Sequence, residues 1–599
     1  MAETGTPQGK ADKAAPDGVT FLSGTAFETA AWQDPNRTAP PPPENTFELG
    51  LVMAGAVSAG AYTAGVIDFI VEALDTWDRE RAAGNPRAPT HQVRVPVMSG
   101  TSAGGMTTAI LAAVAHRDFP HVRMADSDAA ATGNPLFDAW VNQIDWAPLV
   151  RLHEANRSGP PSSILNGDVL DGIVTGVLDD AGTRPSRPRV WLGEVTRVIL
   201  TATNLRGTPY WQDIKGVAND GYGMNNGRDH QTFALHPPAS DDRALPDEIA
   251  LHAGAVGSHL ETWAALGQWA LATGAFPVAL PPRLLRHRPG DRDHRIVVAD
   301  PETPGHYIAI VPGTTRSDST TDQTFLAVDG GVLNNEPLNL ARRVLAGGDG
   351  RNPRQGHRAN RATLLIDPFP AFEASPAPKP GDRALWRIAG ALLATWKGSA
   401  RFNAEDLLLA MHAEVYSRFQ VAPVRGDTNT PRGPLACGVM GGFGGFLHRA
   451  YRRHDYLLGR RNAQRMLRQH LVLPAANPLF KRGGAPGGVE EALRDHRADH
   501  ADGDYYPIIP IIPGTSVDAP EPLPDWPAVN LVDVDTVSRR FADRADAVLG
   551  RTLATMAIDG VGRFFLSILA STVVKRKVRK EVRAYLAKAL GDWHLRDLP

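Results

Sequence analysis

The sequence predicts an α/β fold with a central, mostly parallel β-sheet flanked by helices. Two observations carry this prediction. Short apolar runs of strand length alternate along the chain with longer segments whose apolar residues recur at helical spacing. The first two runs, at 47–53 and 93–98, each pass through a turn of small residues directly into a helical segment. Because parallel strands need a crossover between them, this strand–turn–helix order favours a buried parallel sheet.

The remaining elements follow the same pattern. A helix is predicted after the first strand, because apolar residues recur there at helical spacing: Val66, Ile67, Ile70, Leu74 and Trp77. Further strands are expected at 197–205, 306–311, 324–331 and 362–369, with helices at 259–273 and 336–347. The polar, Gly-rich segment 206–250 predicts a long loop.

Composition divides the chain into three parts. Residues 1–45 are rich in Ala, Thr, Pro and Asp and end in a proline run, so we expect this segment to be disordered. Residues 46–370 carry the α/β pattern, with a helical insertion at about 120–190 that is placed to cover the sheet. Beyond 370 the strand pattern stops, and 371–599 is expected to be a mainly helical C-terminal extension.

Charge and targeting features exclude several classes of protein. The 599 residues include 63 Lys+Arg and 65 Asp+Glu, whereas nucleic-acid-binding proteins usually carry a strong positive excess. The one cysteine, Cys437, excludes an intrachain disulfide and fits a reducing compartment. The N-terminal residues lack the apolar core of a secretory signal. Uninterrupted apolar runs fall short of the roughly 18 residues that span a bilayer, so we expect a cytoplasmic protein.

The pentapeptide 100–104, Gly-Thr-Ser-Ala-Gly, makes Ser102 a candidate nucleophile. It lies between a predicted strand and a predicted helix, where the small residues Gly100, Ala103 and Gly104 let the chain bend sharply and expose the serine. The N-terminus of the helix favours negative charge that develops there. The alternative is a small residue in a tight turn, because a serine hydroxyl is unreactive until its surroundings activate it.

Asp329 is the candidate base. It closes an apolar run and is followed by Gly330 and Gly331, which allow close backbone approach. A buried aspartate beside a serine hydroxyl can act directly as a general base, since desolvation raises the pKa of its carboxyl group. Two alternatives stay open: an aspartate in an ordinary turn, and a histidine base as in α/β-hydrolases. None of the 19 histidines has a distinguishing context, and the three considered, His287, His294 and His306, lie in or beside a polar loop.

A third turn, at 54–60, is the candidate site for stabilising an oxyanion. It follows a strand and begins a helix, where backbone N–H groups lack intrahelical partners. Donors of this kind are worth roughly 2.7–4 kcal/mol of barrier each. The candidate residues are Gly55, Ala56, Val57 and Gly60. We expect the turns at 54–60, 100–104 and 329–331 to end three parallel strands at one edge of the sheet.

These three motifs, in this order, resemble the patatin-like phospholipases. The similarity covers about 46–370 and rests on "GLVMAGAVSAGAYTAGVIDFI", "MSGTSAGG" and "LAVDGGVLNNEP". The stretch 443–467 is similar to the C-terminal extension of some bacterial members. The resemblance implies a three-layer fold, a lipid or other acyl-ester substrate, and a Ser–Asp dyad without histidine, with Ser102 as nucleophile and Asp329 as base. It implies no metal and no organic cofactor.

The turn at 55–60 departs from the family pattern, in which it usually reads G-G-G-x-R/K-G. Here it reads "GAVSAG", so that Ala56 and Val57 replace glycines and Ala59 replaces the basic residue. A glycine at positive φ does not exchange freely for valine. Two alternatives to hydrolysis therefore stay open: acyl transfer on the same fold, and a catalytically weakened protein that binds or scaffolds lipid.

The segment 561–590 is amphipathic and carries a basic block from Lys575 to Lys580. Such a block attracts anionic lipid headgroups, so we expect peripheral contact with a membrane here. The alternative is a terminal helix that docks on the body of the protein with its charged face in solvent. The sequence indicates no oligomeric state.

Overall fold

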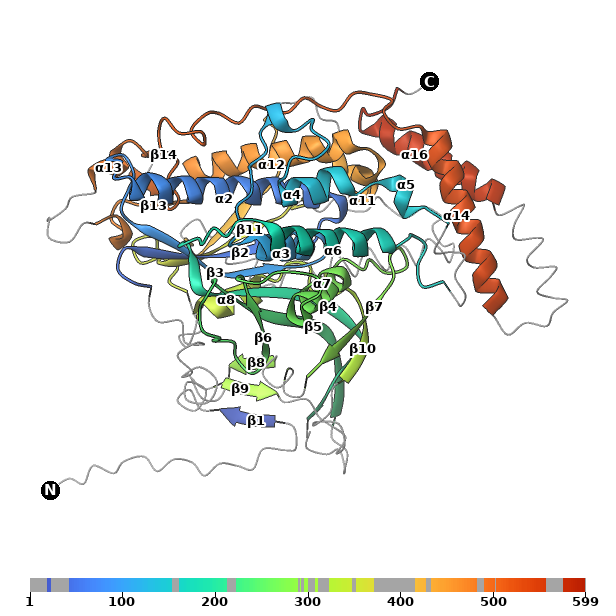
Figure 1. Ribbon diagram of the computed structural model, residues 1–599, viewed down its shortest axis with the longest axis horizontal. Helices are drawn as coiled ribbons and strands as arrows, with labels where there is room; N and C mark the ends of the chain where they lie inside the picture. Colours follow the sequence, from blue (N-terminus) through green and yellow to red (C-terminus); the bar gives the residue numbers. More distant parts are fainter. Residues whose placement is uncertain are drawn as a thin grey trace.

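The computed structural model describes residues 19–22, 42–152, 161–212, 222–288, 291, 296–299, 307–310, 323–346, 352–370, 415–426, 433–481, 490–500, 503–555 and 575–597. Within these residues the predicted α/β fold is confirmed (Figure 1). A mixed, mostly parallel sheet lies at the centre, helices flank it, and a helical C-terminal region is present.

Nine strands form the central sheet. Five of them run parallel to their neighbours in the order β12 (Arg418–Val421), β11 (Arg361–Ile366), β2 (Thr46–Met53), β3 (Gln92–Gly100) and β4 (Leu192–Gln212). The other four are β10 (Gln323–Asp329), β7 (Arg283–His287), β5 (Tyr222–His236) and β6 (Glu248–His252). Both β10 and β5 pair with β4 in antiparallel fashion.

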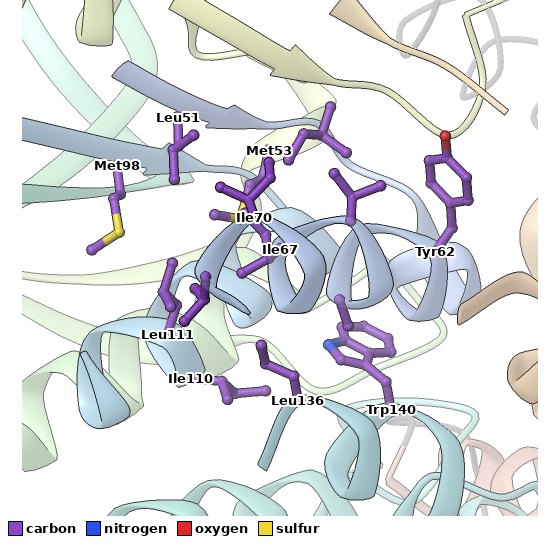
Figure 2. Packing of buried hydrophobic residues seen from close by; sticks show 14 of the residues in the cluster. Leu51, Met53, Tyr62, Ile67, Ile70, Met98, Ile110, Leu111, Leu136 and Trp140 are labelled. Carbon is purple, nitrogen blue, oxygen red and sulfur yellow. The ribbon is translucent and has the colours of Figure 1, made fainter. Parts of the chain in front are cut away.

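Helices cover both faces of this sheet. The larger hydrophobic cluster includes side chains of α2 (Gly60–Ala82), α3 (Ala103–Val114), α6 (Asp168–Thr183) and α7 (Glu261–Thr273). A smaller cluster packs α8 (Leu338–Ala346) on the opposite face. Alternation along β2 feeds both clusters, since Leu51 and Met53 belong to the first and Val52 to the second. Figure 2 shows Ile67 and Ile70 of α2 between these strand residues and Ile110 and Leu111 of α3.

The central helix has one property of a membrane span. By length and composition, residues Val57–Ala82 could cross a bilayer. In the structure, however, 94% of the apolar window is buried inside the protein. Its hydrophobicity is therefore explained by its position in the core, between the sheet and α12 (Arg449–Gln469).

Short elements complete the described fold. The insertion contains η3 (Met124–Asp126), α4 (Pro135–Phe137), a π-helix (Asp138–Gln143) and α5 (Trp146–Leu149) before α6. One small sheet contains β1 (Val19–Leu22), β9 (Tyr307–Ile310) and β8 (Ile296–Ala299). A second small sheet contains β13 (Val472–Pro474), β15 (Gly503–Pro507) and β14 (Ala498–His500). The short helices after β12 are η9 (Ala436–Gly438), α11 (Val439–Gly442), η10 (Gly444–Leu447), η11 (Pro478–Phe480) and α13 (Glu491–Arg494).

Several sequence expectations differ from the structure. The segment 206–250 is not one long loop, because β4 extends into it and β5 and β6 lie within it. Most other residues of β5 are polar or glycine, and its apolar residues Phe233 and Leu235 are buried where it pairs with β4. The strand pattern also continues beyond 370, where β12 extends the central sheet. In the segment expected to be disordered, Val19–Leu22 forms β1, and the remainder of 1–41 lies outside the described residues.

The C-terminal segment 561–590 is described only from residue 575. There α16 (Lys575–Asp592) packs against α14 (Val534–Thr555), as Figure 1 shows. Leu586 and Leu590 are buried, whereas the basic residues of the first turns are mostly exposed. The described part of this segment is thus a docked helix with a solvated basic face, and contact with a membrane stays a prediction.

Buried ion pairs join the C-terminal region to the central helix. Arg460 of α12 donates to Asp68 and Glu72 of α2, the latter at 2.6 Å, and to Glu521 at 2.7 Å. The guanidinium and the Asp68 carboxylate are both fully buried. Burial alone would raise the pKa of the Asp68 carboxyl, but His121 and Arg460 hold it well below its usual range. α12 therefore belongs to the same packed body as the sheet (Figure 1).

We expect Arg460→Met to lower the free energy of unfolding by about 3–5 kcal/mol, because it leaves three buried carboxylates without their shared cation. The matched control is Arg465→Met, since Arg465 is exposed on the same helix. Calorimetric unfolding midpoints compare the two variants, and equal midpoints would contradict the expectation. The lowered pKa of Asp68 also predicts a pH dependence. Its contribution to the free energy of unfolding is present at neutral pH and is lost as pH falls below about 4.

Candidate active site

Ser102 occupies the sharp turn between β3 and α3. Its backbone has φ 53° and ψ −128°, a conformation that a non-glycine residue rarely adopts and that costs roughly 1–3 kcal/mol. Two hydrogen bonds hold it. The Ser102 amide donates to the Thr273 hydroxyl at 2.8 Å, and its carbonyl accepts from the Met106 amide at 3.0 Å. The sequence therefore folds here into the elbow expected of an exposed nucleophile.

The Asp329 carboxylate lies directly against this serine. The Ser102 hydroxyl donates to Asp329 Oδ2 at 2.7 Å, and the Gly331 amide donates to Oδ1 at 2.7 Å. The backbone of Asp329 is also fixed, because its carbonyl accepts from the Thr203 hydroxyl at 2.9 Å and its amide donates to the Ala275 carbonyl at 2.9 Å. With Asp329 only 4% exposed and Ser102 only 8% exposed, the pair is largely shielded from water.

Strand directions explain why these two residues meet. Along β4, Gly100 at the end of β3 is opposite Leu200, and Asp329 at the end of β10 is opposite Ala202. β5 pairs with both of these β4 residues from the other edge, so β3 and β10 share one edge of β4. They run in opposite directions along it and end head to head. The expectation that three parallel strands end at one edge is therefore wrong for β10, although its carboxyl end reaches the predicted place.

The turn after β2 is the third component, and it lies beside the elbow. A Cβ atom at Gly55 would lie 3.1 Å from Cβ of Ser102, so the backbone passes directly over the serine. The Gly55 amide donates to the Asn335 carbonyl at 3.2 Å, and it is therefore not a free oxyanion donor. The predicted role of Gly55 is thereby corrected: the residue permits close approach.

Val57 holds a backbone conformation suited to glycine. Its φ is +51°, in the left-handed region where a β-branched residue is an outlier. Val57 and Ala103 both line the pocket that contains Ser102 and Asp329. Each begins a helical segment, where first-turn amides lack intrahelical partners. In the described part of the chain, neither amide has another acceptor.

The other predicted residues lie at points of close packing. Ala56 is fully buried and precedes Val57. A Cβ atom at any of four glycines would overlap a neighbouring residue, and these are Gly60 against Trp140, Gly100 against Thr108, Gly104 against Met53, and Gly330 against Thr201. Gly331 instead supplies its amide to Asp329. Of the predicted site residues, Ser102, Asp329, Val57 and Ala103 line one pocket, and the others lie in the same three turns.

An apolar pocket opens beside Ser102 and Asp329. Its walls come from three parts of the chain. The insertion supplies Trp140, Ile144, Leu149, Leu165 and Leu170, the core supplies Met106, Phe276 and Leu280, and the C-terminal region supplies Phe443 and Phe446. The insertion therefore contributes part of the wall of the site.

Sequence reasoning missed several residues that build this site. Thr273 and Thr203 fix the backbones of the serine and the aspartate, but an isolated threonine gives no local signal. Phe443 and Phe446 flank two glycines in the motif "FGGF". The sequence indicates only that this stretch is similar to the C-terminal extension of some family members. The motif could have drawn attention, yet nothing in it indicates that it reaches residues some 340 positions away.

The described lining of the pocket offers no second residue type that commonly serves as nucleophile or base beside Ser102 and Asp329. Among the described residues that line it, none is a histidine or a cysteine. His287 lies at the other end of β10 from Asp329 and pairs with Asp229 at 2.8 Å, whereas His294 and His306 lie outside the described residues. Burial raises the pKa of the Cys437 thiol well above its usual value, so it stays protonated.

One group in the described part of the chain has residue types that bind metal. Candidate ligand atoms of His236, Asp242 and His252 lie within 4.8 Å of one another. However, Nε2 of His236 already accepts a hydrogen bond from the Arg243 amide at 2.8 Å. None of the three residues lines the pocket. We therefore assign this group no part in the chemistry at Ser102.

A three-layer α/β fold, a serine on a strand–turn–helix elbow and an apolar pocket together are typical of serine acyl hydrolases. Comparison with known proteins agrees. The family model described as patatin-like phospholipase matches residues 51–342. An uncharacterized protein of Sinorhizobium fredii, y4iI, is 31% identical over 548 residues, which are 85% of this chain and 76% of that protein.

The chain therefore belongs to the patatin-like phospholipase family, and the resemblance stated from its motifs is confirmed. Membership makes it a lipid acyl hydrolase in the general sense of that family. Among solved structures, VipD from Legionella pneumophila is 12% identical and aligns over 99% of this chain and 98% of that one. Its TM-score of 0.22 is too low to support any argument.

We expect Thr273→Val to slow modification of Ser102 by a fluorophosphonate by about tenfold, because a buried amide loses its acceptor at a cost of about 1–3 kcal/mol. Thr273→Ser is the matched control, since it keeps the hydroxyl group. The second-order rate of phosphonylation is the measurement. Equal rates for the two variants would show that the hydroxyl does not hold the elbow.

Proposed function

We propose that this protein hydrolyses fatty-acyl ester bonds of lipids through a dyad of Ser102 and Asp329. The observation that supports it best is the 2.7 Å hydrogen bond from the serine hydroxyl to the buried aspartate. A serine needs a base within this distance to become a nucleophile. The aspartate needs no further partner for that role, and the strained elbow directs the serine toward the pocket.

The proposed reaction has two steps. Ser102 Oγ attacks the acyl carbonyl carbon while Asp329 Oδ2 accepts the hydroxyl proton. The resulting oxyanion is stabilised by the amides of Val57 and Ala103 and by the N-terminus of α3. When the tetrahedral intermediate collapses, the carbon–oxygen bond to the alcohol breaks, and the proton passes from Asp329 to that alcohol. Water then attacks the acyl-serine while Asp329 accepts its proton. The bond from the acyl carbon to Ser102 Oγ breaks, the proton passes from Asp329 to Ser102 Oγ, and the fatty acid leaves.

The lining of the pocket favours a fatty-acyl chain as the group bound beside the dyad. Apart from Ser102 and Asp329, the residues around it are apolar, aromatic or glycine. Burial of apolar surface stabilises binding by roughly 25 cal/mol per Å², so a long alkyl chain gains most there. Glycerophospholipid is the leading substrate on the family relationship.

The dyad is tested by fluorophosphonate labelling of the wild type, Ser102→Ala and Asp329→Asn. We expect the wild type to label and Ser102→Ala not to label. Asp329→Asn should label about 10²–10⁴-fold more slowly, because the amide cannot accept the serine proton as a base does. Ser127→Ala is the matched control, since Ser127 is also buried and its hydroxyl bonds only to the nearby Met124 carbonyl.

Each alternative has its own outcome. Wild-type protein that is folded but neither labels nor hydrolyses esters would contradict the proposal and favour a lipid-binding protein. Labelling followed mainly by transfer of the acyl group to an added alcohol would indicate acyl transfer. Loss of activity on replacement of one histidine would indicate a histidine base.

We expect Leu280→Trp to reduce kcat/KM for long-chain p-nitrophenyl esters by about tenfold relative to short-chain esters. The larger ring occupies space in the pocket, and loss of one or two buried methylene groups from the contact costs about 0.8 kcal/mol each. Leu284→Trp is the control, because Leu284 is 66% exposed on β7. An unchanged chain-length profile in Leu280→Trp would place the acyl chain elsewhere.

A further inference from the structure

Ser58 lies next to the strained residue of the oxyanion turn and contacts a distant part of the chain. Its side chain is fully buried. The Ser58 hydroxyl donates to the Gly442 carbonyl and accepts from the Gly445 amide at 3.0 Å. Both partners lie in the Gly-rich segment 438–447, more than 380 positions further along the chain. One hydroxyl group thus joins the turn at 55–60 to the C-terminal region.

The Gly-rich segment has the backbone freedom and the space to make this contact. Met440, Gly441 and Gly442 have φ of 56°, 67° and 101°, so three consecutive residues adopt positive φ. A Cβ atom at Gly442 would lie 3.4 Å from the Ala56 carbonyl, in the turn itself. A Cβ atom at Gly445 would lie 2.5 Å from Ser58 Oγ. Glycine at 445 therefore lets the segment approach Ser58 closely.

Two buried side chains of α12 hold this segment and the two residues directly before it in place. Asp455 accepts from the amides of Ala436 and Cys437 at 2.8 and 2.9 Å. Arg452 donates to the Gly445 carbonyl at 2.5 Å and to the Val141 carbonyl at 3.0 Å. Burial lowers the pKa of Arg452 to about 10, so the guanidinium is still charged at neutral pH. The segment is thus fixed both to α12 and to the π-helix of the insertion.

Val57 has a conformation that its own sequence does not favour. In a turn with glycine at this position, φ of +51° would carry no steric cost, but valine adopts it only when its surroundings impose it. The hydroxyl of the neighbouring Ser58 makes two hydrogen bonds to the 438–447 segment, one as donor and one as acceptor. This contact restrains the backbone immediately after Val57.

We propose that Ser58 is a positioning residue, which couples the C-terminal segment 438–447 to the oxyanion turn and thereby holds the Val57 amide toward the reacting carbonyl. The inference rests on the proposed hydrolase function and extends it. The C-terminal region then does in this chain what glycine does in the family's usual turn. The same segment also supplies Phe443 and Phe446 to the pocket.

The test is a double-mutant cycle between positions 57 and 58, measured with the full chain. We expect Ser58→Ala to lower kcat for ester hydrolysis at least tenfold. In the V57G background, the same Ser58→Ala change should lower kcat less than threefold, because glycine adopts positive φ without help. Ser127→Ala is again the control for loss of a buried hydroxyl, and it should leave kcat within twofold of the wild type.

A second variant attacks the contact from its other side. Gly445→Ala keeps Ser58 but places a methyl group against its hydroxyl and against Cys437 Sγ, so it should separate the segment from the turn. We expect the same loss of kcat and the same relief in the V57G background. This variant also serves if Ser58→Ala fails to fold. Unfolding midpoints identify which variants are folded at the assay temperature.

The outcomes separate this inference from the proposed function. If the wild type hydrolyses esters and Ser58→Ala retains kcat within twofold, Ser58 positions nothing. If the Ser58→Ala loss is equal in both backgrounds, the role is not exerted through Val57, and the proposal is overturned. If the wild type neither labels nor hydrolyses, the hydrolase function itself fails, and the positioning role fails with it.

Discussion

Two strands of opposite direction end against the same edge of β4, and the geometry of the site depends on this. β3 ends at Gly100, opposite Leu200 of β4, and Ser102 follows it. β10 approaches from the other direction and ends at Asp329, opposite Ala202 of β4. The 2.7 Å hydrogen bond between the two side chains follows from that register. A shift of one residue in either strand would turn the side chain to the other face of the sheet. The register of the central sheet therefore sets the geometry of the site.

The site stores strain at two neighbouring points, and different parts of the fold hold each of them. Ser102 has a positive φ that the bonds to Thr273 and Met106 stabilise. Val57 has a positive φ beside a serine that is bonded to a segment from the far end of the sequence. Strain of this kind persists only where the surrounding structure determines the backbone. Thr273 lies against the backbone at Ser102, and the Gly-rich segment 438–447 lies against the residue after Val57.

The parts of this arrangement that are local in sequence could be predicted from it. The strand–turn–helix order around Ser102 and the glycines after Asp329 indicated both residues, and the structure brings their side chains together. The direction of β10 relative to its neighbours could not be predicted, since the apolar pattern of a strand does not show whether it pairs in parallel or antiparallel fashion. The sequence did not indicate β5, because most of its residues other than the buried Phe233 and Leu235 are polar or glycine. The pocket wall at Phe443 was missed because only long-range packing brings it there.

If one serine, activated by a carboxylate, carries the acyl group, a fluorophosphonate should modify the wild-type protein at that serine alone. Mass spectrometry of the peptides of the treated protein locates the adduct. We expect one adduct, on Ser102 in the peptide that contains "SGTSAGG". An adduct on any other residue, or a folded protein that carries none, would contradict it.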